Sequence, residues 1–138
     1  MKQKRSSRSV PFSRTREQHS NEMAEDYVEA VFEIMEERSE CRVQDLAKHF
    51  DVSHVTVSRT VGRLQKEGLL ETAPYRPIEL TSKGKRLAIS VIERHKIVLQ
   101  FLVALGVDKK TAQIDSEGIE HHVSEKTLTA MKKFLKTR

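Results

Sequence analysis

The sequence predicts a mainly α-helical protein, with a winged helix-turn-helix domain followed by a second, helical domain. Three observations support this fold class. Residues 43–67 have the pattern of two helices joined by a tight turn, and two short β-prone runs follow them directly. Residues 81–106 then have the length and apolar content of one long helix. We therefore divide the chain into residues 1–20, 21–80 and 81–138.

The composition restricts the class of protein. A chain of 138 residues with 37% hydrophobic content can form one compact domain or two small units that share a core. It has no apolar run of membrane-spanning length and no signal-peptide pattern. A single cysteine, Cys41, excludes an internal disulfide framework and fits a reducing compartment. We therefore expect a cytoplasmic protein without membrane contacts.

The net charge of +5 lies in the first 20 residues, because basic and acidic residues balance in the remainder of the chain. This stretch is rich in Ser, Lys and Arg, a composition that predicts a disordered arm. Such an arm could contact phosphates without reading a base sequence. A solubilising extension explains the same composition equally well.

A helix is expected from a cap at Asn21 to about Arg38. Its apolar stripe comprises Met23, Tyr27, Ala30, Val31, Ile34 and Met35. Asp26 and Glu29 form an i, i+3 carboxylate pair beside this stripe. They lie near enough to its buried side to serve as metal ligands.

The helix-turn-helix pattern begins with a helix over Val43–Phe50. A turn at Asp51-Val52 follows, and Ser53 supplies the N-cap of a second helix over His54–Glu67. Gly68 ends this helix as its C′ residue. The side chains expected to point into the core are Val52, Val57, Val61 and Leu64.

The β-prone runs Leu69–Thr72 and Ile78–Leu80 predict a hairpin, the wing. The exposed face of the second helix is rich in hydrogen-bond donors and carries no acidic residue before Glu67, which suits insertion into the major groove of double-stranded DNA. The candidate DNA contacts are Ser53, His54, Thr56, Ser58, Arg59, Thr60 and Arg63, with Arg76 at the wing tip. A winged helix used for protein docking is the alternative.

The long helix is expected to start at a cap on Thr81 and to end at Gly106. It is too apolar to cover one small winged helix and remain soluble. We therefore expect it to pair with a second copy of the chain, in a homodimer.

The segment Glu117-Gly118-Ile119-Glu120-His121-His122 carries the main chemical signal. If it is helical, Glu117, Glu120 and His121 share one face. Two carboxylates and an imidazole at one point are costly unless a cation joins them. The oxygen-rich, sulfur-free set favours Mn²⁺, with Fe²⁺, Co²⁺ and Zn²⁺ as competitors. Three ligands rarely complete a site, so others must come from elsewhere in the chain.

The winged helix, Glu93-Arg94-His95 in the long helix, Leu-Gly-Val-Asp at residues 105–108 and Glu-Gly-Ile-Glu-His-His-Val-Ser at residues 117–124 follow one another along the chain. This order resembles the diphtheria-toxin-repressor family of metal-dependent regulators, specifically its manganese transport regulator subgroup, from about Met23 to the last helix. The resemblance implies a paired manganese site, with two ions per subunit, between the DNA-binding and dimerisation regions. Its implied ligands are Asp26, Glu29, His95, Glu117, Glu120 and His121.

Asp26 and Glu117 distinguish the subgroups, since iron-responsive relatives carry methionine and cysteine at these positions. The resemblance gives His122 no direct role, and its direction, about 100° from His121 on a helix, makes it a structural or supporting residue.

The resemblance implies a manganese-responsive transcriptional regulator of the bacterial cytoplasm, and not an enzyme. Its metal-activated homodimer would bind palindromic operators and repress manganese uptake genes. One alternative is an iron- or zinc-responsive regulator of the same fold. Another is a small binuclear metallohydrolase, because two bridged ions can activate water, but that activity would leave the winged helix without a use.

Overall fold

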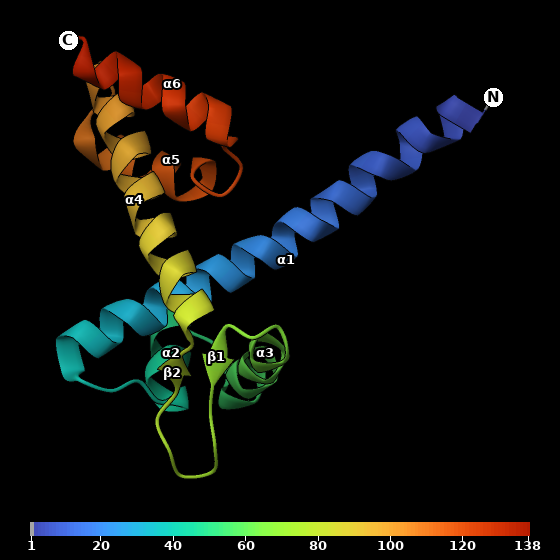
Figure 1. Ribbon diagram of the computed structural model, residues 1–138, viewed down its shortest axis with the longest axis vertical. Helices are drawn as coiled ribbons and strands as arrows, with labels where there is room; N and C mark the ends of the chain where they lie inside the picture. The colour runs from blue at the N-terminus through green and yellow to red at the C-terminus, as the bar shows by residue number, and fades with distance from the viewer. Residues whose placement is uncertain (1) are drawn as a thin grey trace. The chain divides into compact units, whose positions relative to one another are not determined.

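The computed structural model describes the backbone of residues 2–138 and the side chains of residues 19–138. Its element order confirms the predicted mainly α-helical, winged helix-turn-helix class (Figure 1). The elements are α1 (Lys2–Arg38), α2 (Val43–Phe50), α3 (His54–Lys66), β1 (Leu70–Glu71), β2 (Glu79–Leu80), α4 (Ser82–Ala104), α5 (Lys109–Ile119) and α6 (Glu125–Lys136). They fall into two compact units. We call Ala24–Glu93 the winged-helix unit, and residues 1–23 together with Arg94–Arg138 the C-terminal unit.

Helix α1 begins at Lys2, whereas the sequence predicted a disordered arm and a helix start at Asn21. Neither glycine nor proline occurs between Phe12 and Arg38, so the sequence contains no strong helix breaker near Asn21. The separate arm of residues 1–20 and its phosphate contacts stay a prediction. The side chains of residues 1–18 lie outside the described residues.

The core of the winged-helix unit forms on one face of α1, where Tyr27, Val28 and Val31 are buried. Tyr27 stacks on Phe50 of α2, with their ring centroids 4.5 Å apart. This stacking joins the long helix to the first helix of the helix-turn-helix. Full burial of such side chains is the main stabilising contribution, at about 1.5–3 kcal/mol each.

The helix-turn-helix has the predicted bounds, apart from one residue at the end of α3. Asp51 adopts the left-handed conformation (φ 54°) at the turn, and the Val52 N–H donates to the carbonyl oxygen of Ala47. Ser53 caps α3 by accepting a hydrogen bond from the Thr56 N–H at 3.1 Å. One core prediction is wrong: Val52 is 39% exposed, because it belongs to the turn rather than to the buried face of α3.

The wing is an antiparallel hairpin in which Leu70 pairs with Leu80 and Glu71 with Glu79. Its paired part is shorter than the predicted runs. A further bridge joins Ile78 to Cys41, ahead of α2. Gly68 has a positive φ (78°) where α3 turns into the wing, as a C′ glycine does.

The junction of wing and α4 depends on Thr81 and Gly84. Thr81 caps α4 as predicted, since its hydroxyl accepts from the Gly84 N–H at 3.0 Å. A side chain at Gly84 would place its Cβ 2.0 Å from the carbonyl oxygen of Leu69. Only glycine allows α4 to start this close to the wing.

The C-terminal unit has its own small core. Ile97 and Val98 of α4 pack with Leu128 of α6, and Phe101 meets Phe134 edge to face at 5.4 Å. Helix α4 ends near Gly106, which has a φ of 103°. Among the described residues, no helix is long and apolar enough to cross a membrane.

Candidate metal centre and nucleic-acid interface

The exposed face of α3 carries the predicted DNA contacts. Ser53, His54, Thr56, Ser58, Arg59 and Arg63 are exposed, and Thr60 is half-buried. The opposite face, with Val57, Val61 and Leu64, is buried in the core. Helix α3 therefore presents hydroxyl and guanidinium donors to solvent from a firmly packed support.

Some of these polar groups already have partners within the protein. The Ser53 hydroxyl donates to the Thr56 hydroxyl at 2.9 Å, and the Thr60 hydroxyl donates to the Thr56 carbonyl oxygen. Arg63 lies 3.4 Å from the carboxylate of Glu67. Arg59 lies at the middle of the exposed face of α3.

Two exposed apolar residues near this surface were missed by sequence reasoning. Val55 is 66% exposed on the first turn of α3, and Tyr75 is 99% exposed at the wing tip with a φ of 64°. A turn in which the Arg76 N–H donates to the Ala73 carbonyl oxygen holds the tip. Residue type alone does not distinguish an exposed apolar side chain from a buried one, so no sequence signal marked either residue.

The metal-ligand candidates of the C-terminal unit meet at Glu120. Its Oε2 lies 2.6 Å from Nδ1 of His95, and its Oε1 lies 3.6 Å from Nε2 of His121. Arg94 donates from Nη1 to the Glu120 carbonyl oxygen at 3.0 Å, which fixes the backbone of this residue. Three of the six predicted ligands are thus brought together.

The segment from Glu117 to His122 is only partly helical. Helix α5 ends at Ile119, Glu120 keeps helical dihedral angles as its C-cap, and His121 and His122 follow in a turn. Glu117 is exposed, whereas the side chains of Glu120 and His121 are 4% and 3% exposed. Glu117 therefore differs from Glu120 and His121 in its exposure, and its place among the ligands stays a prediction.

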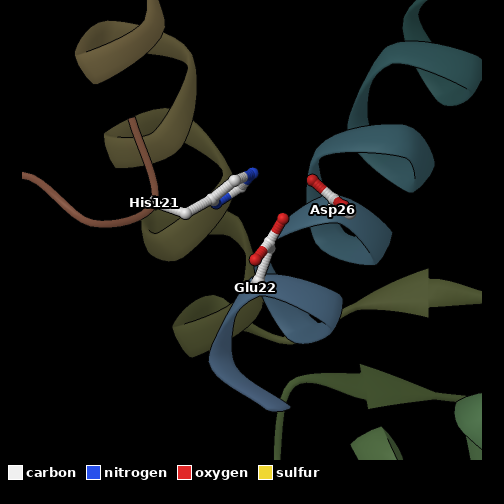
Figure 2. Close-up of side chains that lie close together, drawn as sticks. All are labelled: Glu22, Asp26 and His121. Carbon is white, nitrogen blue, oxygen red and sulfur yellow. The ribbon is translucent and has the colours of Figure 1, made fainter. Parts of the chain in front are cut away.

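Asp26 and Glu29 belong to the winged-helix unit, where both are half-buried on α1. Glu22, one turn before Asp26, was not among the predicted ligands. Its carboxylate lies within 4.8 Å of the His121 imidazole, and Figure 2 shows Glu22 directed toward that ring. It also lies 3.4 Å from Nε2 of His122. Its i, i+4 spacing from Asp26 was the available sequence signal, hidden among the many acidic residues of α1.

Among the described residues, the Cys41 thiol and the Asp108 carboxyl have shifted pKa values. Burial, followed by the charge of Asp45, raises the pKa of the Cys41 thiol to about 12. Cys41 is therefore a packed residue and not a thiolate ligand. The hydrogen bond from the Thr111 backbone N–H lowers the pKa of Asp108, which caps α5.

The donor set of the C-terminal unit fits a divalent cation. A buried carboxylate with two imidazole nitrogens beside it is the combination that binds first-row divalent ions, and the absence of sulfur among these ligands disfavours the softest metals. A carboxylate as buried as Glu120 needs compensation by cationic or hydrogen-bonding groups. The residues present therefore match a metal centre.

Family models match both parts of the chain. Residues 20–78 match the N-terminal DNA-binding domain of iron-dependent repressors, and residues 81–138 match their metal-binding and dimerisation domain. The transcriptional regulator MntR of Escherichia coli O157:H7 is 44% identical over 123 residues, 89% of this chain and 79% of that protein. The HTH-type transcriptional regulator MntR of Bacillus subtilis is 40% identical over 100 residues, 72% of this chain and 70% of that protein.

Solved structures agree with this relationship. The manganese regulator SloR is 28% identical, with a TM-score of 0.72 over 83% of this chain and 54% of that one. A manganese-dependent transcriptional repressor in complex with manganese is 26% identical, with a TM-score of 0.73 over 83% and 53%. This chain thus spans about half the length of these two structures. On the matches to both of its domains, the chain belongs to the iron-dependent repressor family of metal-dependent transcriptional regulators.

Proposed function

We propose that this protein is a manganese-responsive transcriptional regulator, which binds a palindromic operator as a homodimer and represses manganese uptake genes. The observation that carries the proposal is the buried carboxylate of Glu120 beside His95 and His121, in a chain whose other unit presents a donor-rich helix α3. Two similar solved structures, a manganese regulator and a manganese-dependent repressor, support the choice of ion. A cytoplasmic location follows from contact with DNA.

The full ligand set that we propose comprises Asp26, Glu29, His95, Glu117, Glu120 and His121, with two Mn²⁺ ions per subunit. Asp26 and Glu117 offer hard oxygen donors, which favour Mn²⁺ over softer ions. Glu117 is exposed in the structure, so it would have to turn toward the centre on ligand binding. Such a change fits a site that metal helps to order.

The proposed switch acts by charge neutralisation. Asp26 and Glu29 belong to the same unit as the recognition helix α3, whereas His95, Glu117, Glu120 and His121 belong to the C-terminal unit. Without a cation, the carboxylates of the two units would repel one another on approach. On sharing a cation they would link the two units and narrow the range of positions of α3 in each protomer. A dimer that holds two recognition helices at a fixed spacing binds two half-sites more tightly.

The metal itself supplies charge compensation and cross-linking, and no chemical step is required of it. The metallohydrolase alternative has no support among the relatives, which are transcriptional regulators. Iron and zinc remain competing ions for the test, because the affinity order of divalent metals lets Zn²⁺ bind tightly at such ligands.

The test is a selection of DNA duplexes from a random library by the purified protein with Mn²⁺, followed by affinity measurements on the enriched duplex. Binding is measured with Mn²⁺, Fe²⁺, Co²⁺ and Zn²⁺ in turn and with a chelator. We expect an enriched inverted repeat and the tightest response at physiological Mn²⁺. Enrichment that is equal with Mn²⁺ and with chelator would refute the proposal.

A further inference from the structure

We propose that Glu22 is a further metal ligand, which lets the C-terminal unit hold one cation before Asp26 and Glu29 take part. The proposal rests on the proposed function, because it extends the same metal centre. Glu22 stands on α1 but belongs to the C-terminal unit, together with His95, Glu120 and His121. It is not among the six ligands that the family resemblance implies.

The Glu22 carboxylate lies close to the His121 imidazole. A carboxylate oxygen of Glu22 and an imidazole nitrogen of His121 lie within 4.8 Å of each other (Figure 2). Two ligand atoms on one divalent ion are at most about 4.4 Å apart, since each metal–ligand bond is about 2.0–2.2 Å long. A small rotation of the Glu22 side chain is therefore enough for both atoms to bind one ion.

The negative charges of Glu22 and Asp26 lie close together on α1. Glu22 and Asp26 are spaced i, i+4 on α1, and their ligand oxygens also lie within 4.8 Å. Like charges at this spacing destabilise a helix. The Glu22 carboxylate has His122 as a neighbour, but this pair is 33% and 43% exposed and so contributes little to stability. A cation beside Glu22 would remove the repulsion more effectively than an exposed imidazole does.

Glu22 would also complete the set of ligands for one ion. Without Glu22, the ligand candidates that meet at Glu120 are one carboxylate, that of Glu120, and two imidazoles, the half-buried His95 and the buried His121. Three protein ligands leave a divalent ion with an open coordination. A carboxylate from Glu22 would raise the set to four ligands and would balance the charge of the ion with two carboxylates. The C-terminal unit could then bind its ion without help from the winged-helix unit.

The experiment is a calorimetric Mn²⁺ titration of the full-length protein without DNA. Glu22→Gln keeps the size of the side chain and removes its charge, and His122→Gln removes only the neighbouring imidazole. Glu33→Gln is a matched control, because Glu33 is an exposed carboxylate on the same helix. We expect Glu22→Gln to weaken Mn²⁺ binding about 10–100-fold and the other two variants to bind as the wild type does.

A second set tests the order of loading. The double variant Asp26→Asn, Glu29→Gln should still bind one Mn²⁺ per subunit, and adding Glu22→Gln should abolish that binding. The visible spectrum of the Co²⁺-loaded protein should change with Glu22→Gln, because the donor set around the ion changes. Circular dichroism without metal should be the same for all variants.

Each outcome has one meaning. If Glu22→Gln binds Mn²⁺ with wild-type affinity, Glu22 is not a ligand, and the proposed function is unaffected. An equal loss in His122→Gln also overturns the inference, since Glu22 would then act by holding His122. A wild-type protein that binds no Mn²⁺ refutes the proposed function itself.

Discussion

Nδ1 of His95 lies 2.6 Å from Oε2 of Glu120, although 25 residues separate the two in the sequence. Helix α4 supplies the imidazole and the end of α5 supplies the carboxylate. The side chain of Glu120 is 4% exposed and that of His95 is 28% exposed, so the contact is buried on its carboxylate side. Loss of either partner would leave a buried group without compensation, which costs free energy. A cation that binds both partners would be held strongly, because little water competes for it.

Glu120→Gln should weaken Mn²⁺ binding and metal-dependent DNA binding while the fold stays intact. Glutamine has nearly the same size and can still donate and accept hydrogen bonds, but it lacks the charge that a divalent ion requires. We expect a loss of about 10–100-fold in metal affinity, measured by calorimetry, with an unchanged circular dichroism spectrum. Unaltered Mn²⁺ dependence of DNA binding in this variant would exclude Glu120 as a ligand.

Asp26→Met should move the metal preference away from Mn²⁺ and toward Fe²⁺. A thioether is a softer donor than a carboxylate, and softer donors bind Mn²⁺ poorly. The measurement is DNA affinity as a function of each free ion under anaerobic conditions. Glu33→Met is the control, since Glu33 is an exposed residue of the same helix. A response to Mn²⁺ as strong as that of the wild type would show that Asp26 does not select the ion.

Arg59→Ala should reduce affinity for the enriched duplex by about 1–3 kcal/mol if the guanidinium reads a guanine edge. The side chain is exposed on α3, so its loss should leave the free energy of unfolding nearly unchanged. Fluorescence anisotropy with the enriched duplex and with a scrambled duplex gives the affinity and the specificity. Arg86→Ala on α4 is the control for a simple loss of positive charge. A uniform loss on both duplexes would mean that Arg59 contacts only phosphate.

The fall in the free energy of unfolding at low pH should depend on Asp108. The hydrogen bond from the Thr111 N–H lowers the pKa of its carboxyl below the ordinary value of 3.8. Because the folded-state pKa lies below the unfolded one, ionised Asp108 contributes stability above about pH 3.8 and the contribution is lost as the pH falls through the folded-state pKa. The stability difference between wild type and Asp108→Asn should therefore be full at pH 6 and vanish in acid.

Urea unfolding between about pH 2.5 and 6 measures this difference. Asp115→Asn, an exposed aspartate later in α5, is the matched control. A wild-type advantage over Asp108→Asn that is constant across this range would contradict the assigned role of the charge.

Removal of residues 1–18 should flatten the salt dependence of DNA binding. The segment carries six basic residues and one acidic residue. Each phosphate contact that is lost reduces the slope of log K against log salt concentration by about 0.9. Equal slopes for the full and shortened proteins would show that this segment is a solubilising extension.

Local signals in the sequence were sufficient for most of the winged-helix unit. The caps at Ser53 and Thr81 and the left-handed positions at Asp51 and Gly68 depend on neighbours within a few residues, and all four occur in the structure. The family resemblance was confirmed by the matches to both domains. Short-range chemistry of this kind can be read from residue types alone.

The remaining features depend on long-range packing. The contact between His95 and Glu120 joins two helices, and periodicity gave no link between His95 and the acidic cluster. Helix α5 ends at Ile119, and Glu117 in its last turn is exposed whereas Glu120 is buried, a difference that the shared spacing does not predict. Glu22 was hidden for a similar reason, because its proximity to His121 comes from the approach of α1 to the turn after α5.

The most direct test of metal-activated DNA binding is a comparison of Mn²⁺ affinity for the free protein and for the protein bound to the enriched duplex. If Mn²⁺ strengthens DNA binding by some factor, DNA must strengthen Mn²⁺ binding by the same factor, which is typically about 5–150-fold for coupled sites. We predict a matching increase in the DNA-bound protein. Equal Mn²⁺ affinities in the two states would contradict the account.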